Sequence, residues 1–159
     1  MIRTGIGIDS HKLAPGRRLV LGGVEIAAHD VGLAGHSDAD VLTHAVIDAL
    51  LGAAALGDIG QHFPDSDERW RDADSIQLLG EVVAMIAAAG FSVVNVDATV
   101  MIERPRLADH RDAMRARLAG ALGVEASAVN IKATTGEGLG FIGRQEGAAA
   151  VAVATLNET

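Results

Sequence analysis

The chain contains no cysteine and no tyrosine, and its aromatic residues are limited to one tryptophan and three phenylalanines. The lack of cysteine excludes disulfide bonds, thiolate metal ligands and cysteine nucleophiles, so any metal ion must be held by histidine, carboxylate or water. An aromatic content of 3% argues against a stacking platform for single-stranded nucleic acid. Basic residues are also few: 13 lysines and arginines against 21 acidic residues give a net charge of −8, which opposes binding to DNA or RNA.

Long apolar runs are absent as well. No uninterrupted apolar stretch reaches the length of a membrane span, and the N-terminus lacks the basic and apolar regions of a signal peptide. We therefore expect a cytoplasmic protein that binds neither membranes nor nucleic acid. Hydrophobic residues nevertheless make up 49% of the 159 positions, which is enough for a substantial core in a single domain spanning residues 1–159.

The pattern of apolar residues predicts an α+β single domain. Alternation over residues 2–9 is typical of a strand, and Gly22-Gly23 between two short apolar runs indicates a tight hairpin. Residues 27–35 and 58–67 are expected to be loops. The other expected elements are strands over 91–102, 129–135 and 146–156, and helices that end near 57, over 75–89 and over 107–122.

These elements suggest helices on one face of a mixed four-stranded sheet, with the small hairpin beside it. The last expected strand is apolar on both sides, because Val151 and Val153 alternate with alanines. Helices on one face leave the other face to be covered in some other way. We therefore expect the sheets of several copies of the chain to pack together.

Residues 35–52 begin with a small polar turn and continue as a mostly apolar helix, for which Ser37 or Asp38 is the expected N-cap. Ionisable groups on a buried helix are costly unless they are paired or bind a ligand. We therefore expect the polar residues of this helix to have partners elsewhere, with two aspartates in supporting positions. These polar residues share one arc of the helix and are Asp40, Thr43, His44 and Asp48.

Asp9 and His11 lie two residues apart at the end of the first expected strand, so their side chains point to the same face. Together with His44 they offer two imidazoles and one carboxylate, a ligand set that leaves a fourth position open, as in catalytic zinc sites. Two ordinary explanations stay open. An Asp-x-His pair at a strand end can be solvated surface, and His44 can be a hydrogen-bonded histidine of the core.

A second candidate is the glycine-rich segment 134–144, which combines Thr134, Thr135 and Arg144 with several glycines. Hydroxyls, free backbone amides and a guanidinium group are suited to holding phosphate oxygens. The spacing is not that of a Walker loop, so a nucleoside triphosphate site of that type is not indicated. A plain turn between two strands would explain the same glycines.

Several longer motifs occur in order along the chain. They are Asp9-Ser10-His11, His36 to Val41 with His44, Gly57 to Gly60 with Phe63-Pro64-Asp65, Ala73-Asp74-Ser75, Asn95-Val96-Asp97, Arg104-Pro105-Arg106, and Lys132 to Thr135 with Gly143-Arg144. Together these motifs resemble the 2-C-methyl-D-erythritol 2,4-cyclodiphosphate synthase family of the non-mevalonate isoprenoid pathway. The resemblance covers essentially the whole chain, and its second and third motifs are specific in combination.

The resemblance implies a lyase that converts 4-diphosphocytidyl-2-C-methyl-D-erythritol 2-phosphate to 2-C-methyl-D-erythritol 2,4-cyclodiphosphate and CMP. Since the 2-phosphate of the substrate is the nucleophile, catalysis rests on positioning and charge neutralisation. The resemblance further implies a homotrimer with active sites between neighbouring subunits. The trimer would enclose a central channel that accepts isoprenoid diphosphates, with Arg144 and Glu146 at one end.

Two metal ions are implied by the same resemblance. Asp9, His11 and His44 would hold zinc, and Glu137 would help to hold magnesium or manganese at the diphosphate. His36 and Thr135 would stabilise charge in the transition state.

The resemblance also implies which residues contact the substrate. They belong to the metal site, to a loop around the erythritol phosphate, to a cytidine pocket supplied by the neighbouring subunit, and to the glycine-rich segment. They are Asp9, Ser10, His11, His36, Ser37, Asp58, Ile59, Gly60, Phe63, Pro64, Asp65, Ser66, Asp67, Ile102, Glu103, Arg104, Pro105, Arg106, Leu107, Ala108, Thr134, Thr135, Gly136, Glu137, Phe141 and Arg144.

Two other functions are compatible with these residues. One is a metal-dependent phosphodiesterase that uses zinc-bound water. The other is a non-catalytic trimeric protein that binds isoprenoid phosphates. The products formed from the diphosphocytidyl substrate distinguish all three.

Overall fold

A computed structural model describes residues 1–26 and 30–159 of the chain. Its main feature is one mixed sheet with the strand order β4-β1-β7-β5-β6. Strands β5 and β6 run parallel, and the other neighbours are antiparallel. The strands of this sheet are β1 (Ile2–Pro15), β4 (Val31–Ala34), β5 (Phe91–Met101), β6 (Val129–Thr134) and β7 (Gly147–Glu158), and the separate hairpin consists of β2 (Val20–Leu21) and β3 (Val24–Glu25).

The sheet has five strands rather than the four expected from the sequence, because β4 lies within the predicted loop 27–35. Four residues are too few to show an alternating pattern, and β4 exists because it pairs with Lys12–Pro15 at the end of β1. Residues 27–29 of that predicted loop lie outside the described residues.

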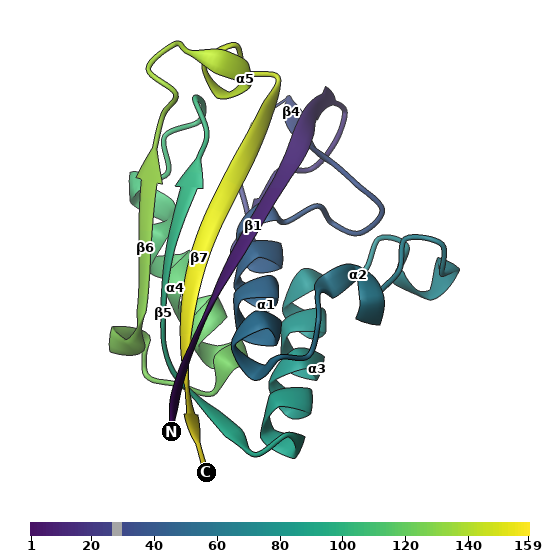
Figure 1. Ribbon diagram of the computed structural model, residues 1–159. Helices are drawn as coiled ribbons and strands as arrows, with labels where there is room; N and C mark the ends of the chain where they lie inside the picture. Colours follow the sequence, from purple (N-terminus) through teal and green to yellow (C-terminus); the bar gives the residue numbers. More distant parts are fainter. Residues whose placement is uncertain (27–29) are drawn as a thin grey trace.

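Three long helices cover one face of the sheet, as expected (Figure 1). They are α1 (Val41–Ala54), α3 (Ser75–Ala88) and α4 (Arg111–Leu122). Helix α4 connects the two parallel strands, which need such a crossover. The short elements are α2 (Ile59–His62), α5 (Gly140–Gly143) and the 3₁₀ turns η1 (Glu68–Trp70), η2 (Ala108–His110) and η3 (Ala126–Ala128). Within the described residues, no helix has both the length and the apolar character needed to cross a bilayer.

Helix α1 lies directly on β1 at the centre of the molecule. A Cβ atom on Gly5 or Gly7 would overlap backbone atoms of α1, including the carbonyl oxygens of Ala49 and Ala45. The side chains that alternate with these glycines point to the opposite face, where Ile6 and Ile8 are 61% and 64% exposed. Glycines on one side of β1 therefore bring the helix close, while isoleucines on the other side form an apolar surface.

This second face of the sheet stays uncovered in a single chain. Val153 of β7 pairs with Ile6 in register and is also exposed. Figure 1 shows α4 behind the strands and α1 and α3 beside β1, and none of the described elements lies across the front of the sheet. A face of this kind is typical of a surface that packs against other copies of the same chain.

Candidate functional site

Two elements, β1 and α1, bring the three candidate ligands together. Strand β1 continues in extended form beyond Asp9, so Asp9 and His11 both point toward α1, and His44 lies in the first turn of that helix. The helix begins at Val41 because the Asp40 side chain caps it, accepting from the backbone N–H of Thr43 at 3.0 Å. The predicted N-caps Ser37 and Asp38 were therefore wrong, and their side chains have other partners.

Asp40 is structural rather than part of the metal site. Its carboxylate also accepts from the Thr43 hydroxyl at 2.7 Å and from the backbone N–H groups of Gly22 and Gly23 at 2.9 and 2.7 Å. The buried carboxylate thus has several donors and ties the β2–β3 hairpin to the start of α1. Asp48 has a similar supporting role, since it accepts from the backbone N–H of Ile59 at 2.7 Å and holds the start of α2.

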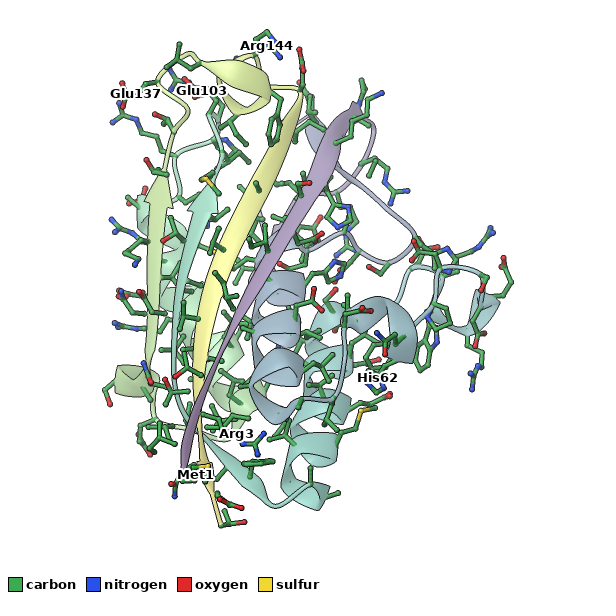
Figure 2. All side chains as sticks on the ribbon, in the orientation of Figure 1. Met1, Arg3, His62, Glu103, Glu137 and Arg144 are labelled. Carbon is green, nitrogen blue, oxygen red and sulfur yellow. The ribbon has the colours of Figure 1, made fainter. Side chains whose placement is uncertain are left out.

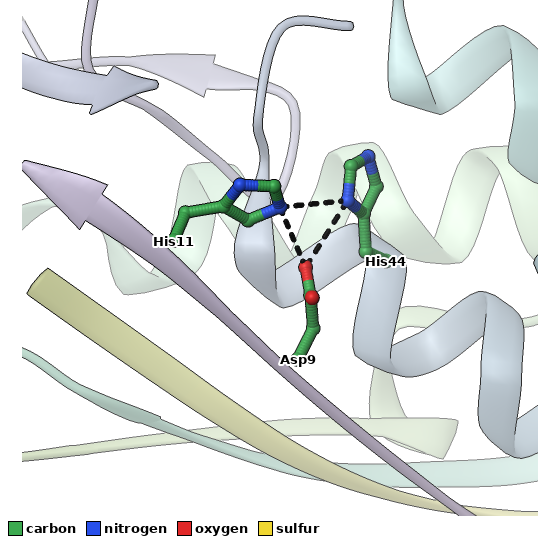
Figure 3. A group of neighbouring side chains, drawn as sticks. All are labelled: Asp9, His11 and His44. Atoms are coloured by element: carbon green, nitrogen blue, oxygen red, sulfur yellow. Dashed lines mark hydrogen bonds and ion pairs between the residues drawn. The ribbon is translucent and has the colours of Figure 1, made fainter. Parts of the chain in front are cut away.

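The side chains of Asp9, His11 and His44 converge on one point (Figure 3). Asp9 Oδ2 lies 2.9 Å from His11 Nε2 and 3.1 Å from His44 Nδ1, and the two nitrogens are 3.2 Å apart. In a tetrahedral zinc site with bonds of about 2.0 Å, neighbouring ligand atoms are roughly 3.3 Å apart. Both the donor atoms and their spacing therefore fit a zinc ion that keeps one coordination position open.

The electrostatics of the cluster favour a cation. Burial by itself would raise the pKa of Asp9, but the hydrogen bonds that His11 and His44 donate when their rings are protonated outweigh it and lower that pKa to about 2. Burial acts to lower the pKa of His11, yet the hydrogen bond and the charge of Asp9 raise it above 6.5. The cluster therefore holds an ionised carboxylate and attracts positive charge.

The proton on His11 is placed by the backbone. Its Nδ1 lies 3.0 Å from the carbonyl oxygen of Ala34 and must donate to it, so in the neutral ring Nε2 presents its lone pair to the cluster. Ala34 belongs to β4, the strand that local sequence patterns do not reveal. For His44 the arrangement is reversed: Nδ1 faces the cluster, and Nε2 lies 2.8 Å from Ser75 Oγ.

Sequence reasoning missed the two residues that hold His44 from behind, Ser75 and Asp38. Asp74, and not Ser75, caps α3 by accepting from Ile76 N–H at 2.9 Å. Ser75 instead begins the helix, and its hydroxyl donates to Asp38. The Ala73-Asp74-Ser75 motif could have revealed this role. Asp74 is enough to cap the helix, so the hydroxyl of Ser75 is available for another partner.

A pocket of about 470 Å³, the metal-site pocket, surrounds the three candidate ligands. Trp70 is one of its walls and was not predicted. Its lining consists of Asp9, His11, Gly35, His36, Ser37, His44, Ile59, Gly60, Phe63, Pro64, Asp65, Trp70 and Leu78.

Several predicted contact residues lie outside that lining. Asp58 caps α2 by accepting from Gln61 N–H at 3.0 Å. Asp67 forms an ion pair with Arg69 at 2.6 Å, while its backbone oxygen accepts from His36 Nε2 at 3.2 Å. Ser66 is exposed beside it.

A second pocket of about 190 Å³, the strand-end pocket, lies where the parallel strands β5 and β6 end. Arg111 is an unpredicted member, and Arg104, which was predicted, is exposed outside the lining. The residues that line this pocket are Ile102, Glu103, Pro105, Arg106, Leu107, Ala108, Arg111, Ala133, Thr134 and Thr135.

The glycine-rich segment is held against this pocket. Glu103 Oε2 accepts from the backbone N–H of Gly136 at 2.8 Å, and Thr135 Oγ1 accepts from Glu137 N–H at 3.2 Å. Figure 2 shows Glu103, Glu137 and Arg144 at the same end of the sheet, far from Met1 and Arg3. The carboxylate of Glu137 is exposed there.

A third hollow lies near the end of β1, and Ser10 and Phe141 both line it. Ser10 points away from Asp9 and His11 because successive side chains of a strand alternate. Nearby, the guanidinium of Arg144 pairs with Glu146 at 2.7 Å. The predicted contact residues are thus distributed over three places on one chain.

The metal-site pocket and the strand-end pocket lie toward opposite edges of the sheet. One adjoins β1 and the other adjoins β6, with β7 and β5 between these strands. Three strand spacings correspond to about 14 Å. The two pockets are therefore separate sites on a single chain.

Comparison with known proteins gives a consistent result. Residues 2–157 match the model of the YgbB family. A 2-C-methyl-D-erythritol 2,4-cyclodiphosphate synthase from Salinibacter ruber is 59% identical over 155 residues, which is 98% of each chain. The bifunctional IspDF of Campylobacter jejuni has a TM-score of 0.95 and 43% identity over 100% of this chain and 43% of its own.

A structure of Plasmodium falciparum IspF, described as a CDP complex, has a TM-score of 0.87 and 30% identity over 99% of this chain and 97% of its own. The agreement therefore extends from the sequence to the whole fold. The chain belongs to the YgbB family, the family of the 2-C-methyl-D-erythritol 2,4-cyclodiphosphate synthases.

Proposed function

We propose that this chain cyclises 4-diphosphocytidyl-2-C-methyl-D-erythritol 2-phosphate to 2-C-methyl-D-erythritol 2,4-cyclodiphosphate and releases CMP, a step of the non-mevalonate isoprenoid pathway. The observation that carries this proposal is the convergence of Asp9, His11 and His44 in the metal-site pocket. It occurs in a chain 59% identical to a synthase of that name.

In this reaction an oxygen of the 2-phosphate attacks the β-phosphorus. The bond from that phosphorus to the bridging oxygen breaks, and CMP leaves with the electron pair. The protein supplies no nucleophile, so its task is to hold the two phosphates in line and to offset their charge. Zinc held by Asp9, His11 and His44 would polarise a phosphate oxygen.

The erythritol phosphate end of the substrate belongs in the metal-site pocket. His36 lines this pocket, and its Nε2 donates to the backbone oxygen of Asp67. This bond fixes the ring and anchors the loop that carries Phe63, Pro64 and Asp65. We infer that His36 orients the transferred phosphate while the loop excludes water from it.

The cytidine end belongs in the strand-end pocket. Arg106 and Arg111 give this pocket positive charge in a chain whose net charge is −8. The hydroxyls of Thr134 and Thr135 lie on the same wall and suit phosphate oxygens. The CDP complex of the Plasmodium relative is consistent with a cytidine nucleotide as the ligand of such a pocket.

The second cation would be magnesium or manganese beside Glu137. This carboxylate is exposed next to the hydroxyl of Thr135, at the edge of the strand-end pocket. One carboxylate is a weak ligand set for such an ion, so the diphosphate itself would supply further oxygens. The cation would therefore bind together with the substrate.

A homotrimer would complete the site. Its sheets would pack through the uncovered face that carries Ile6, Ile8 and Val153. Each metal-site pocket would then meet the strand-end pocket of a neighbour, and Thr135 would complete the transition-state contacts begun by His36. Light scattering of the purified protein should give the mass of three chains.

The decisive experiment incubates the purified protein with the diphosphocytidyl substrate, zinc and magnesium. Phosphorus NMR and chromatography should show CMP and the cyclic diphosphate formed in equal amounts. CMP with only linear phosphates would identify a phosphodiesterase that uses metal-bound water instead. If the protein bound the substrate but formed no product, its role would be non-catalytic.

A further inference from the structure

We propose that Asp38 and Ser75 form a hydrogen-bond relay that fixes the tautomer of His44 and thereby sets how tightly the metal site binds zinc. The inference rests on the metal site of the proposed function. Neither residue touches the cluster of ligand atoms, so both act as positioning residues through the imidazole.

The direction of the relay follows from counting protons. Ser75 has one hydroxyl proton, and this proton is donated to Asp38 Oδ1. The oxygen of Ser75 can then only accept from His44 Nε2, which lies 2.8 Å away. The neutral ring of His44 must therefore carry its proton on Nε2, and Nδ1 is left with a lone pair aimed at Asp9 and His11.

Asp38 is well suited to maintain this direction because all its other partners are donors. Its Oδ2 accepts from the backbone N–H of Ser75 at 2.9 Å, and its Oδ1 accepts from Asp40 N–H at 3.1 Å. With donors on both oxygens, the carboxylate is held in one orientation. Its negative charge also favours the direction in which Ser75 donates to Asp38 and accepts from His44, which leaves Nδ1 of His44 free for a metal ion.

Burial makes the relay effective. Ser75 is fully buried and His44 is 8% exposed, so water cannot easily replace a lost partner. Ser37 Oγ lies 3.2 Å from the same Nε2, but it also accepts from Ala39 N–H at 3.3 Å and its own proton is not committed to a carboxylate. Ser75 is therefore the partner that determines the tautomer.

The test measures zinc affinity by competition with a chelator in the full-length protein. Ser75→Ala removes the acceptor, and we expect a 10- to 100-fold loss of affinity, the range found for such partners of metal-bound histidine. Asp38→Asn should also weaken binding, because its amide group can donate to Ser75 Oγ and reverse the relay. Unfolding curves of each variant show whether the fold is retained.

Asp74→Ala is the matched control. Asp74 caps the same helix next to Ser75 but contacts Ile76 N–H rather than His44. It should lower stability and leave zinc affinity unchanged. If Asp74→Ala lost as much zinc affinity as Ser75→Ala, the affinity would depend on the intact start of α3 and not on the relay.

A second readout follows the tautomer directly. Nitrogen-15 NMR of the metal-free protein should find the proton of His44 on Nε2, and Ser75→Ala should give a mixture of tautomers. A proton on Nδ1 in the unmodified protein, or unchanged affinity in Ser75→Ala, would overturn the relay. If the unmodified protein binds no zinc at all, the metal site fails and the relay fails with it.

Discussion

At the residue scale, the hydrogen bonds of two histidines determine which ring nitrogen each presents to the candidate metal site. His11 presents Nε2 to the cluster because its Nδ1 is bonded to Ala34, whereas His44 presents Nδ1 because its Nε2 is bonded to Ser75. The two imidazoles thus use different nitrogens, each selected by a neighbour outside the cluster. The third candidate ligand atom belongs to Asp9, whose pKa of about 2 keeps it ionised at neutral pH.

His44→Ala is expected to abolish zinc binding, since Asp9 and His11 alone are too few ligands for a stable site. Metal analysis after dialysis should find no zinc in the variant and one ion per chain in the unmodified protein. His62→Ala serves as the control, because His62 bonds to Leu56 O away from the cluster. Full zinc occupancy in His44→Ala would remove His44 from the site.

Asp48→Asn is expected to stabilise the metal-free protein at neutral pH by up to about 1 kcal/mol. Burial raises the pKa of Asp48, so its ionised form is disfavoured in the folded state. This penalty is absent well below the ordinary pKa of 3.8, where the carboxyl is protonated in the folded and unfolded chains, and it grows as the pH rises through the ordinary and then the raised pKa. Asparagine keeps an acceptor for Ile59 N–H without the charge.

Urea unfolding of both proteins in a chelator, from pH 4 to pH 7, measures the difference. The gain in the free energy of unfolding should shrink as the pH is lowered. A gain that stays constant over this range would show that the charge of Asp48 is not its cause.

At the element scale, the contact between β1 and α1 positions the site. Asp9 and His11 are supplied by the strand and His44 by the helix, so the separation of these two elements sets the separation of the ligands. The close approach depends on the glycines of β1, which leave room for the backbone of α1. Small residues on both elements therefore serve the geometry of the ligands as well as the packing of the core.

Gly7→Ala tests this dependence. The added methyl group would overlap the carbonyl of Ala45, a backbone atom that cannot move without shifting the helix. We expect a loss of about 3 kcal/mol in the free energy of unfolding and weaker zinc binding. Gly52→Ala is the control: its Cβ would lie 3.8 Å from Ile6 O, so it should be neutral or slightly stabilising. Equal stability of the two variants would contradict the close packing.

On the scale of the whole molecule, the pockets are separated by the width of the sheet and one sheet face is uncovered. Both features are explained if neighbouring chains share each active site. The net charge of −8 makes copies of the chain repel one another, so association would be confined to the apolar face.

Mixing two inactive variants tests the sharing of sites. His44→Ala damages the metal-site pocket, and Ala108→Trp fills the strand-end pocket. Co-expression should restore part of the activity, because some sites in mixed oligomers combine one intact pocket from each chain. Each variant alone should be inactive, and no recovery in the mixture would place both pockets of a site within one chain.

Much of the architecture could be predicted from local patterns. The alternation in β1 correctly placed Asp9 and His11 on one face, and the apolar runs located the long helices on one side of the sheet. Strand β4 and the true caps Asp40 and Asp74 were missed. A four-residue strand is too short to show a periodic pattern. Near Asp40 and Asp74, neighbouring polar residues are equally good cap candidates until the tertiary structure shows which partners each side chain has.

The sequence by itself determined the family, the identity of the donor groups and the exclusion of sulfur ligands, because these depend on residue types and their order. Only the tertiary structure decided which atoms face one another: Ala34 O and Ser75 Oγ select the nitrogens of the two histidines, and Asp38 sets the direction of the second bond. The bonds made by the two histidines join residues 23 and 31 positions apart, and Ser75 and Asp38 are 37 apart. Such contacts arise from packing of whole elements, and no local pattern encodes them.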